Sequence, residues 1–120
     1  FNIKKRKKDA IKRAEAYSEA GADAILIHSK EKNPNKIFDF SKTFLKSKFH
    51  KPIIAVPSSY SIVKENVLAK NGIRVVIYAN QLLRASYPAM YNTAKKILKH
   101  KRSKEAEKNM TSIDNIINLI

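Results

Sequence analysis

The sequence contains no cysteine, no tryptophan and only two glycines among its 120 residues. Without cysteine, the chain can form neither a disulfide scaffold nor a cysteine-ligated zinc site, and this composition suits a reducing compartment, so we expect a cytoplasmic protein. The three histidines are too far apart in sequence for a zinc motif. Gly21 and Gly72 each follow a helical pattern, where glycine commonly ends a helix, so no glycine-rich phosphate loop is available.

Long apolar segments are also missing. No apolar run approaches the roughly 18 residues that a membrane span needs, so we expect no membrane association. The basic start, FNIKKRKKDA, leads into charged residues and does not resemble a signal peptide. Because the chain begins with Phe1 rather than Met and is short, we expect residues 1–120 to be part of one longer domain.

Acidic residues are scarce, and the formal net charge is +15. Basic clusters at Lys4–Lys8 and Lys95–Lys104 raise the alternative of a nucleic-acid-binding module. However, 20 lysines stand against 5 arginines and are scattered through every segment. Selected phosphate or base contacts favour arginine interleaved with exposed aromatic residues, so the pattern favours a solvated surface over a nucleic-acid interface.

Short apolar runs alternate with helical patterns along the chain. Strands are expected at residues 24–28, 52–56 and 74–79, each too short and too continuously apolar for a surface helix. The first expected helix ends at Gly21. The second is capped by Asn33, has Pro34 at its first position and ends near Lys48, and the third is capped by Ser61 and ends at Gly72. The fourth, at residues 81–100, is kinked or split by Pro88, and the last is capped by Thr111 or Ser112.

This order, α-βα-βα-βα-α, predicts an α/β fold with a parallel sheet and right-handed crossovers. Three strands that are apolar on both faces need helices on one side and further structure on the other. A (β/α)₈ barrel of roughly 250 residues would supply both. We therefore expect the last three βα units of such a barrel, followed by C-terminal helices.

Ligands of parallel α/β folds bind at the carboxyl ends of the strands. Three polar stretches occupy these ends, and they are His28-Ser29-Lys30, Pro57-Ser58-Ser59-Tyr60 and Asn80-Gln81. These stretches offer hydrogen-bond donors without a carboxylate, which suits a phosphate, phosphonate or carboxylate ligand and provides no magnesium ligands. A lone histidine at a strand end is commonly structural, but the Ser and Lys that follow it favour a binding role. The tyrosines at 60, 78 and 87 are expected to pack rather than to act as bases.

Three stretches, DAIKRAEAYSEAGADAILIHSK, PIIAVPSSYS and NGIRVVIYANQLLRASYPAM, closely resemble in order and spacing the C-terminal part of the phosphoenolpyruvate mutase family. This family belongs to the isocitrate lyase/phosphoenolpyruvate mutase superfamily. The resemblance extends from Asp9 through nearly the whole chain and includes the trailing SIDNIINLI. AGADAILIHSK and VIYANQLLRASYPAM are its most specific parts.

The resemblance implies a (β/α)₈ barrel whose last helix is exchanged between subunits of dimers and tetramers. It also implies Mg²⁺-dependent interconversion of phosphoenolpyruvate and phosphonopyruvate, a small-molecule reaction that opens phosphonate biosynthesis. His28 corresponds to the histidine that helps to hold the transferring phosphoryl group, whereas the lyase branch typically has a Glu-containing motif there. Ser29, Lys30, Ser58, Asn80 and Gln81 are expected at the pocket rim.

The sequence also departs from the family pattern. Gln81 replaces a usual His, and Ser59 replaces a usual Thr, although both keep hydrogen-bonding capacity. The family's metal-binding carboxylates, gating loop and phosphoryl-contacting Arg belong to earlier strands and are absent, so we expect no catalysis by this chain alone. Because the gating loop is what mainly separates the two enzymes, phosphonopyruvate hydrolase stays an alternative.

Overall fold

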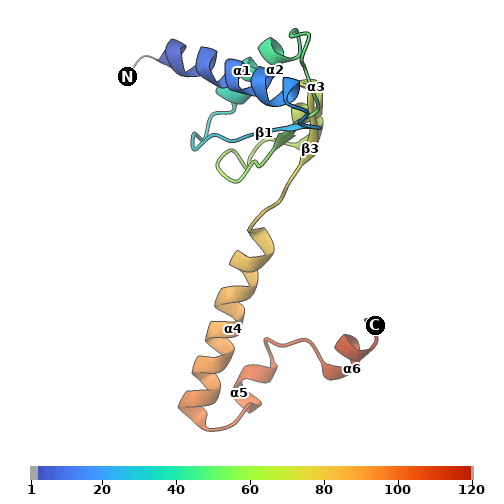
Figure 1. Ribbon diagram of the computed structural model, residues 1–120. Coiled ribbons are helices and arrows are strands. Elements are labelled where there is room, and N and C mark those ends of the chain that lie inside the picture. Colours follow the sequence, from blue (N-terminus) through green and yellow to red (C-terminus); the bar gives the residue numbers. More distant parts are fainter. Residues whose placement is uncertain (1–2, 120) are drawn as a thin grey trace. The chain divides into compact units, whose positions relative to one another are not determined.

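The computed structural model describes residues 3–119, with side chains described from Lys7 onward, and the chain forms two compact units (Figure 1). The first unit runs to Ala79 and the second begins at Asn80. The first contains, in order, α1 (Ile3–Glu19), β1 (Ile25–Ile27), α2 (Asn35–Phe44), β2 (Ile53–Ala55), α3 (Glu65–Lys70) and β3 (Ile73–Val76). The predicted alternation of strands and helices is thereby confirmed.

The three strands form a parallel sheet in the order β1-β2-β3. Ile25, Leu26 and Ile27 pair with Ile53, Ile54 and Ala55, one residue after another. The β2–β3 register shifts after the pair Ile53–Ile73, so that Ile54 faces Val75 and Ala55 faces Val76. The extra residue, Arg74, is the exposed member of this bulge.

One face of the sheet carries the core. Ile25, Ile53 and Ile73 are buried there against residues of all three helices of the unit. The helical members of this core are Ala14 of α1, Ile37, Phe40 and Phe44 of α2, and Leu68 of α3. Phe40 and Phe44 lie one turn apart and stack with ring centroids 5.5 Å apart. The helices therefore form a single layer on one side.

The opposite face of the sheet is apolar but open. Because side chains alternate along a strand, Leu26, Ile54 and Val75 point away from the core. Leu26 is 55% exposed and Val75 is 45% exposed, while Ile54 is half-buried. The strands thus lack, within this unit, the second covering that their continuous apolar sequences led us to expect.

Helix ends in the first unit follow the glycines. At Gly21 (φ +104°), the N–H of Ala22 donates to the carbonyl of Tyr17 at 3.0 Å and the N–H of Gly21 to that of Ser18 at 3.2 Å, a Schellman motif. Gly72 (φ +84°) ends α3 with its N–H on the Ala69 carbonyl. Both predicted helix stops are confirmed.

Several element boundaries differ from those expected. The helix α2 starts at Asn35, one residue after Pro34, although the Asn33 side chain does accept the Asn35 N–H at 2.9 Å. It ends at Phe44 because the following residues tighten into turns rather than continue to Lys48. The prediction of a Ser61 cap is wrong: the chain turns between Tyr60 and Val63, and α3 begins only at Glu65.

The second unit contains α4 (Gln81–His100), α5 (Lys104–Glu107) and α6 (Ile113–Ile117). Pro88 lies inside α4 and does not split it, because the helix continues from Gln81 to His100. Ser112 caps α6 by accepting the Asn115 N–H at 3.2 Å, as predicted. The short helix α5 was not predicted from the sequence, because it has too few apolar residues at helical spacing.

None of the helices within residues 3–119 combines the length and the apolar character that crossing a bilayer requires.

Candidate functional site

His28 is the first residue after β1 and lies at the carboxyl end of the sheet. The strand alternates between the buried Ile25, the exposed Leu26 and the half-buried Ile27. Continued by one residue, this alternation places His28, which is exposed, on the same open face as Leu26. The imidazole therefore starts from the face opposite the helical layer.

Ser29 and Lys30 continue the chain into a turn beside α2. The Ser29 hydroxyl accepts the Glu31 N–H at 3.2 Å, which fixes this turn locally. Together with His28, these two residues line a cavity of about 600 Å³ that also contacts α1 and α2. Its other lining residues are Lys7, Ala10, Ile27, Glu31, Lys36, Ile37, Asp39 and Phe40.

The charges around this cavity favour an anion. Lys36 of α2 forms an ion pair with Glu31 in the turn that precedes this helix. Lys7 and Lys30 have no carboxylate within ion-pair distance among the side chains that the structure describes. Two lysines and one histidine are thus available to a negatively charged ligand, while Asp39 is the acidic residue left in the lining.

Ser58 follows the carboxyl end of β2, the strand next to β1. Its hydroxyl oxygen is buried and has no hydrogen-bond partner among residues 7–119. The hydroxyl of Tyr60 in the same loop is likewise buried and unpartnered, and burial raises the pKa of this tyrosine. Tyr60 is only 1% exposed and belongs to the core, as its predicted packing role requires.

Asn80 and Gln81 open α4 in the second unit. The Gln81 side-chain oxygen accepts the backbone N–H of Asn80 at 3.1 Å, so Gln81 rather than Asn80 provides the side-chain contact at this helix start. The side-chain oxygen of Asn80 is buried without a partner among the described residues. Of the predicted rim residues, Ser29 and Lys30 line the same cavity as His28, whereas Ser58 follows the neighbouring strand and does not line it.

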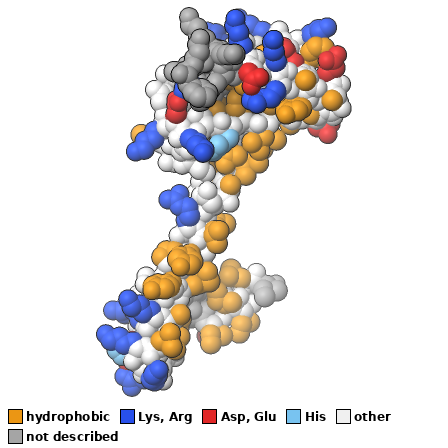
Figure 2. Space-filling view, turned by 60° about the vertical axis from the view of Figure 1, so that its left-hand side comes forward, with side chains coloured by type: hydrophobic (Ala, Val, Ile, Leu, Met, Phe, Trp, Pro, Cys, Tyr) orange, Lys and Arg blue, Asp and Glu red, His pale blue; other side chains and the backbone are white. Residues whose placement is uncertain are grey.

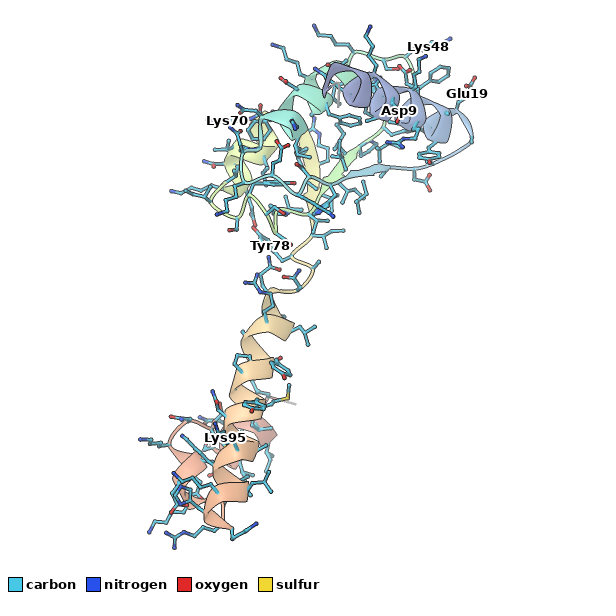
Figure 3. All side chains as sticks on the ribbon, turned by 90° about the vertical axis from the view of Figure 1, so that its left-hand side faces the viewer. Asp9, Glu19, Lys48, Lys70, Tyr78 and Lys95 are labelled. Atoms are coloured by element: carbon cyan, nitrogen blue, oxygen red, sulfur yellow. The ribbon has the colours of Figure 1, made fainter. Side chains whose placement is uncertain are left out.

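Tyr78 forms a contact that sequence reasoning missed. It lies just beyond β3 (Figure 3), and its hydroxyl donates to a carboxylate oxygen of Glu65, the first residue of α3, at 2.7 Å. This hydrogen bond raises the pKa of Tyr78. The ring is 56% exposed, so the expectation of a core or helix-packing residue is wrong for Tyr78, whereas the exposed Tyr87 stacks on Tyr91 with ring centroids 6.2 Å apart. A tyrosine next to an apolar strand looks like part of the apolar run in the sequence, so the Tyr78–Glu65 hydrogen bond could not be predicted from it.

The described side chains do not assemble a metal site. Among residues 7–119, no group of three or more His, Asp or Glu side chains is close enough to hold an ion. Acidic residues near the strand ends are limited to Glu31 and Asp39 around the cavity and to Glu65, which is engaged by Tyr78. A hard cation such as Mg²⁺ prefers several oxygen ligands, so these residues do not fit it by themselves.

The sequence matches the model of one protein family, described as phosphoenolpyruvate phosphomutase, over residues 2–98. A curated relative, the phosphoenolpyruvate phosphomutase of Tetrahymena pyriformis, is 39% identical over 111 residues. That alignment covers 92% of this chain and 36% of the relative. The chain therefore spans little more than a third of the length of this relative.

Two solved structures are similar to the fold. A phosphoenolpyruvate phosphomutase from Streptomyces platensis subsp. rosaceus matches with a TM-score of 0.83 and 34% identity, over 94% of this chain and 38% of that one. A phosphonopyruvate hydrolase in complex with oxalate and Mg²⁺ matches with a TM-score of 0.79 and 35% identity, over 94% and 39%. Both are TIM-barrel superfamily proteins, so the predicted fold class is confirmed.

Proposed function

The chain belongs to the phosphoenolpyruvate phosphomutase family, and from this premise we propose that it forms part of an isomerase that interconverts phosphoenolpyruvate and phosphonopyruvate. In this proposal residues 1–120 are the C-terminal part of one (β/α)₈ barrel, and the reaction supplies phosphonate biosynthesis. By itself the chain is inactive, because the metal-binding and gating residues of the reaction come from other strands.

The observation that carries the proposal is the position of His28. It stands at the carboxyl end of a parallel strand, where barrel enzymes bind their ligands, and its side chain starts from the open face of the sheet, with Ser29 and Lys30 following it in the chain. A phosphoryl or phosphonyl group carries charge on three oxygens, which such donors match. His28 accordingly binds this group, and Lys30 and Ser29 lie at the rim.

The reaction explains why fixed donors are needed. Breaking the carbon–phosphorus bond leaves a metaphosphate-like group that must stay in place until the enolate oxygen of pyruvate attacks it. A preorganised donor stabilises the charge on the phosphoryl oxygens without having to reorient during the reaction. Ser58, whose hydroxyl is buried without a described partner, is a second donor at the carboxyl end of the neighbouring strand.

Magnesium, location and assembly follow from the same premise. We assign Mg²⁺ to the whole enzyme, with ligands outside the described residues, because the related hydrolase is solved with Mg²⁺. A cytoplasmic location agrees with a chain that has no cysteine. We assign a homo-oligomer with exchanged C-terminal helices, since α4 has no buried residue of its own and carries a stripe of exposed apolar side chains.

The test uses the full-length protein. Replacing His28 by alanine should lower the rate of conversion of phosphonopyruvate to phosphoenolpyruvate by a factor on the order of 10² or more, as removal of one oxyanion donor does. His50→Ala is the matched control, because His50 precedes β2 at the opposite edge of the sheet and contacts the Ser47 carbonyl at 2.9 Å. An unchanged rate in His28→Ala would reject the role of this histidine.

Phosphonopyruvate hydrolase is the second candidate. The similarity to a hydrolase structure is nearly as high as that to the mutase, with TM-scores of 0.79 and 0.83. The two activities are separated by their products, since the mutase forms phosphoenolpyruvate and the hydrolase forms pyruvate and phosphate. Phosphorus NMR of the reaction mixture decides between them in the wild-type protein.

A further inference from the structure

Paired residues form rows across the three strands of the sheet, and successive rows point to opposite faces. The last paired row is Ile27, Ala55 and Val76, which follows from the two strand registers. The N–H of Ile77 donates to the Ala55 carbonyl at 2.9 Å, so the parallel ladder continues past this row. The next row therefore contains His28, Val56 and Ile77.

This row points to the face without helices. Ala55 is fully buried on the helical side, so Val56, its neighbour in the strand, faces the other way. Val56 is half-buried, and Ile77 is 38% exposed. Strands in a sheet lie about 4.8 Å apart, which puts the Val56 side chain directly beside His28 and Ile77 one strand further.

The row below it is also apolar. Leu26, Ile54 and Val75 share the same face, two residues before His28, Val56 and Ile77 in their strands. His28 is consequently the single polar side chain in these two rows. Figure 2 shows hydrophobic side chains gathered on the visible surface of the first unit.

Water needs two to four polar partners to be held in a site, and an apolar wall offers none. This matters because the transferring phosphoryl group can react with two nucleophiles. Attack by the enolate oxygen of pyruvate forms an oxygen–phosphorus bond and gives phosphoenolpyruvate. Attack by water forms phosphate instead, and one proton of that water goes to the methylene carbon of the enolate to give pyruvate.

We propose that Val56 and Ile77 keep water away from the phosphoryl group held at His28 and thereby determine the ratio of isomerisation to hydrolysis. This inference rests on the proposed function. It assigns to two apolar residues a part in the choice of product, whereas His28 binds the group whichever nucleophile attacks. Ser58, two residues after Val56, lies beyond the row and is left unchanged in the test.

The experiment measures the products formed from phosphonopyruvate by the full-length protein, using phosphorus NMR. Val56→Thr and Ile77→Thr each add a hydroxyl that can hold a water molecule. Both should raise the phosphate-to-phosphoenolpyruvate ratio at least severalfold. Val56→Ala and Ile77→Val are the matched controls, because they shorten the side chain without adding a polar atom, and the ratio should stay closer to that of the wild type.

Each outcome decides. An unchanged ratio in a threonine variant that still turns over would overturn the inference while leaving the proposed function intact. The same holds if the alanine and valine variants release as much phosphate as the threonine variants, because space rather than polarity would then admit water. A wild-type protein that hydrolyses most of its substrate also overturns it, and one that converts no phosphonopyruvate rejects the proposed function itself.

Discussion

The two units of the chain differ in how far they bury their apolar side chains. In the first unit, residues of three helices and three strands bury one another in a single core. In the second, Ala106 of α5 is the buried hydrophobic residue among those described, and α4 buries none of its own. Figure 2 shows hydrophobic side chains on the surface of the second unit. The exposed hydrophobic residues of α4 include Leu82, Leu83, Tyr87, Met90, Tyr91 and Leu98.

This difference indicates where each unit obtains its stability. A helix is marginal in water unless an apolar face packs against something, because helix propensity alone contributes little. In the first unit, helices and strands of the same unit pack against one another, except on the open face of the sheet. Unit two has an amphipathic α4 whose apolar stripe has no cover within the unit, so its stability depends on a surface that the unit does not contain.

The largest expected effect comes from making the same substitution in both units. Leu68 of α3 is fully buried, whereas Leu83 of α4 is 68% exposed. Leu68→Ala should lower the free energy of unfolding by about 2–5 kcal/mol, because it leaves a cavity in the core. As long as the chain is monomeric, Leu83→Ala should change it by no more than about 0.5 kcal/mol, as exposed substitutions do. Urea unfolding of the chain, followed by circular dichroism, measures both.

Equal losses in the two variants would break the comparison. They would mean that α4 packs in solution as tightly as α3 does, for example by self-association. Repeating the measurement at several protein concentrations separates these cases, because only a self-associated α4 gives a concentration-dependent transition.

A smaller effect sharpens the comparison at the helix ends. Alanine at either Gly21 or Gly72 must adopt a positive φ, which costs about 1–2 kcal/mol. At Gly21 the added Cβ meets open space, but at Gly72 it would come within 2.3 Å of the Leu45 side chain and 2.9 Å of the Ser41 hydroxyl. Ser41 is buried and donates to the Asn71 carbonyl at 2.6 Å, which limits its retreat.

Gly72→Ala should therefore lose about 1–3 kcal/mol more than Gly21→Ala in the same unfolding measurement. The second unit provides the contrast, since Lys101 ends α4 at φ 57° without a glycine and is exposed. If Gly72→Ala cost no more than Gly21→Ala, the contact between the end of α3 and α2 would be loose, and the first unit would be less tightly packed than its buried residues indicate.

Much of the first unit could be predicted because its signals are local. Short apolar runs identify the strands, and Gly21 and Gly72 identify helix ends by the positive φ that each adopts. The Ser61 cap failed because burial of Tyr60 and the bond from the Val63 N–H to the Tyr60 carbonyl form a turn there instead. Tertiary packing, which local sequence does not encode, decided that boundary.

The site could be predicted only in part for the same reason. The strand-end rule finds His28 and Ser58 because it needs only the positions of strands. It does not find the Tyr78–Glu65 pair, which joins two segments 13 residues apart through side chains. The apolar stripe of α4 illustrates the other limit, because an amphipathic pattern predicts that a face is buried but not which surface buries it.

The smallest expected effects are pH-dependent and opposite in the two units. In the first, the bond to Glu65 raises the pKa of Tyr78 above 10.0. In the second, Arg102 donates to Glu105 at 2.6 and 2.9 Å and lowers the pKa of that carboxyl below 4.5. A group whose pKa is higher in the folded than in the unfolded state stabilises the fold at pH values below its unfolded-state pKa. This stabilisation is lost as the pH rises through the folded-state pKa. A group whose pKa is lower in the folded state stabilises the fold at pH values above its unfolded-state pKa. This stabilisation is lost as the pH falls through the folded-state pKa.

NMR titration of the Tyr78 and Glu105 side chains should therefore show each shift disappearing in its own variant, Glu65→Ala for Tyr78 and Arg102→Ala for Glu105. Each variant serves as the control for the other, since the two pairs share no residue. The Arg102 side chain is 65% exposed and that of Glu105 is 27% exposed, so added salt should partly weaken the Arg102–Glu105 shift because water and ions screen such charges. A Tyr78 pKa that stays raised in Glu65→Ala would show that its cause lies in burial of the ring. The end of β3 would then be more enclosed than its exposure indicates, and the open face of the first unit would extend less far.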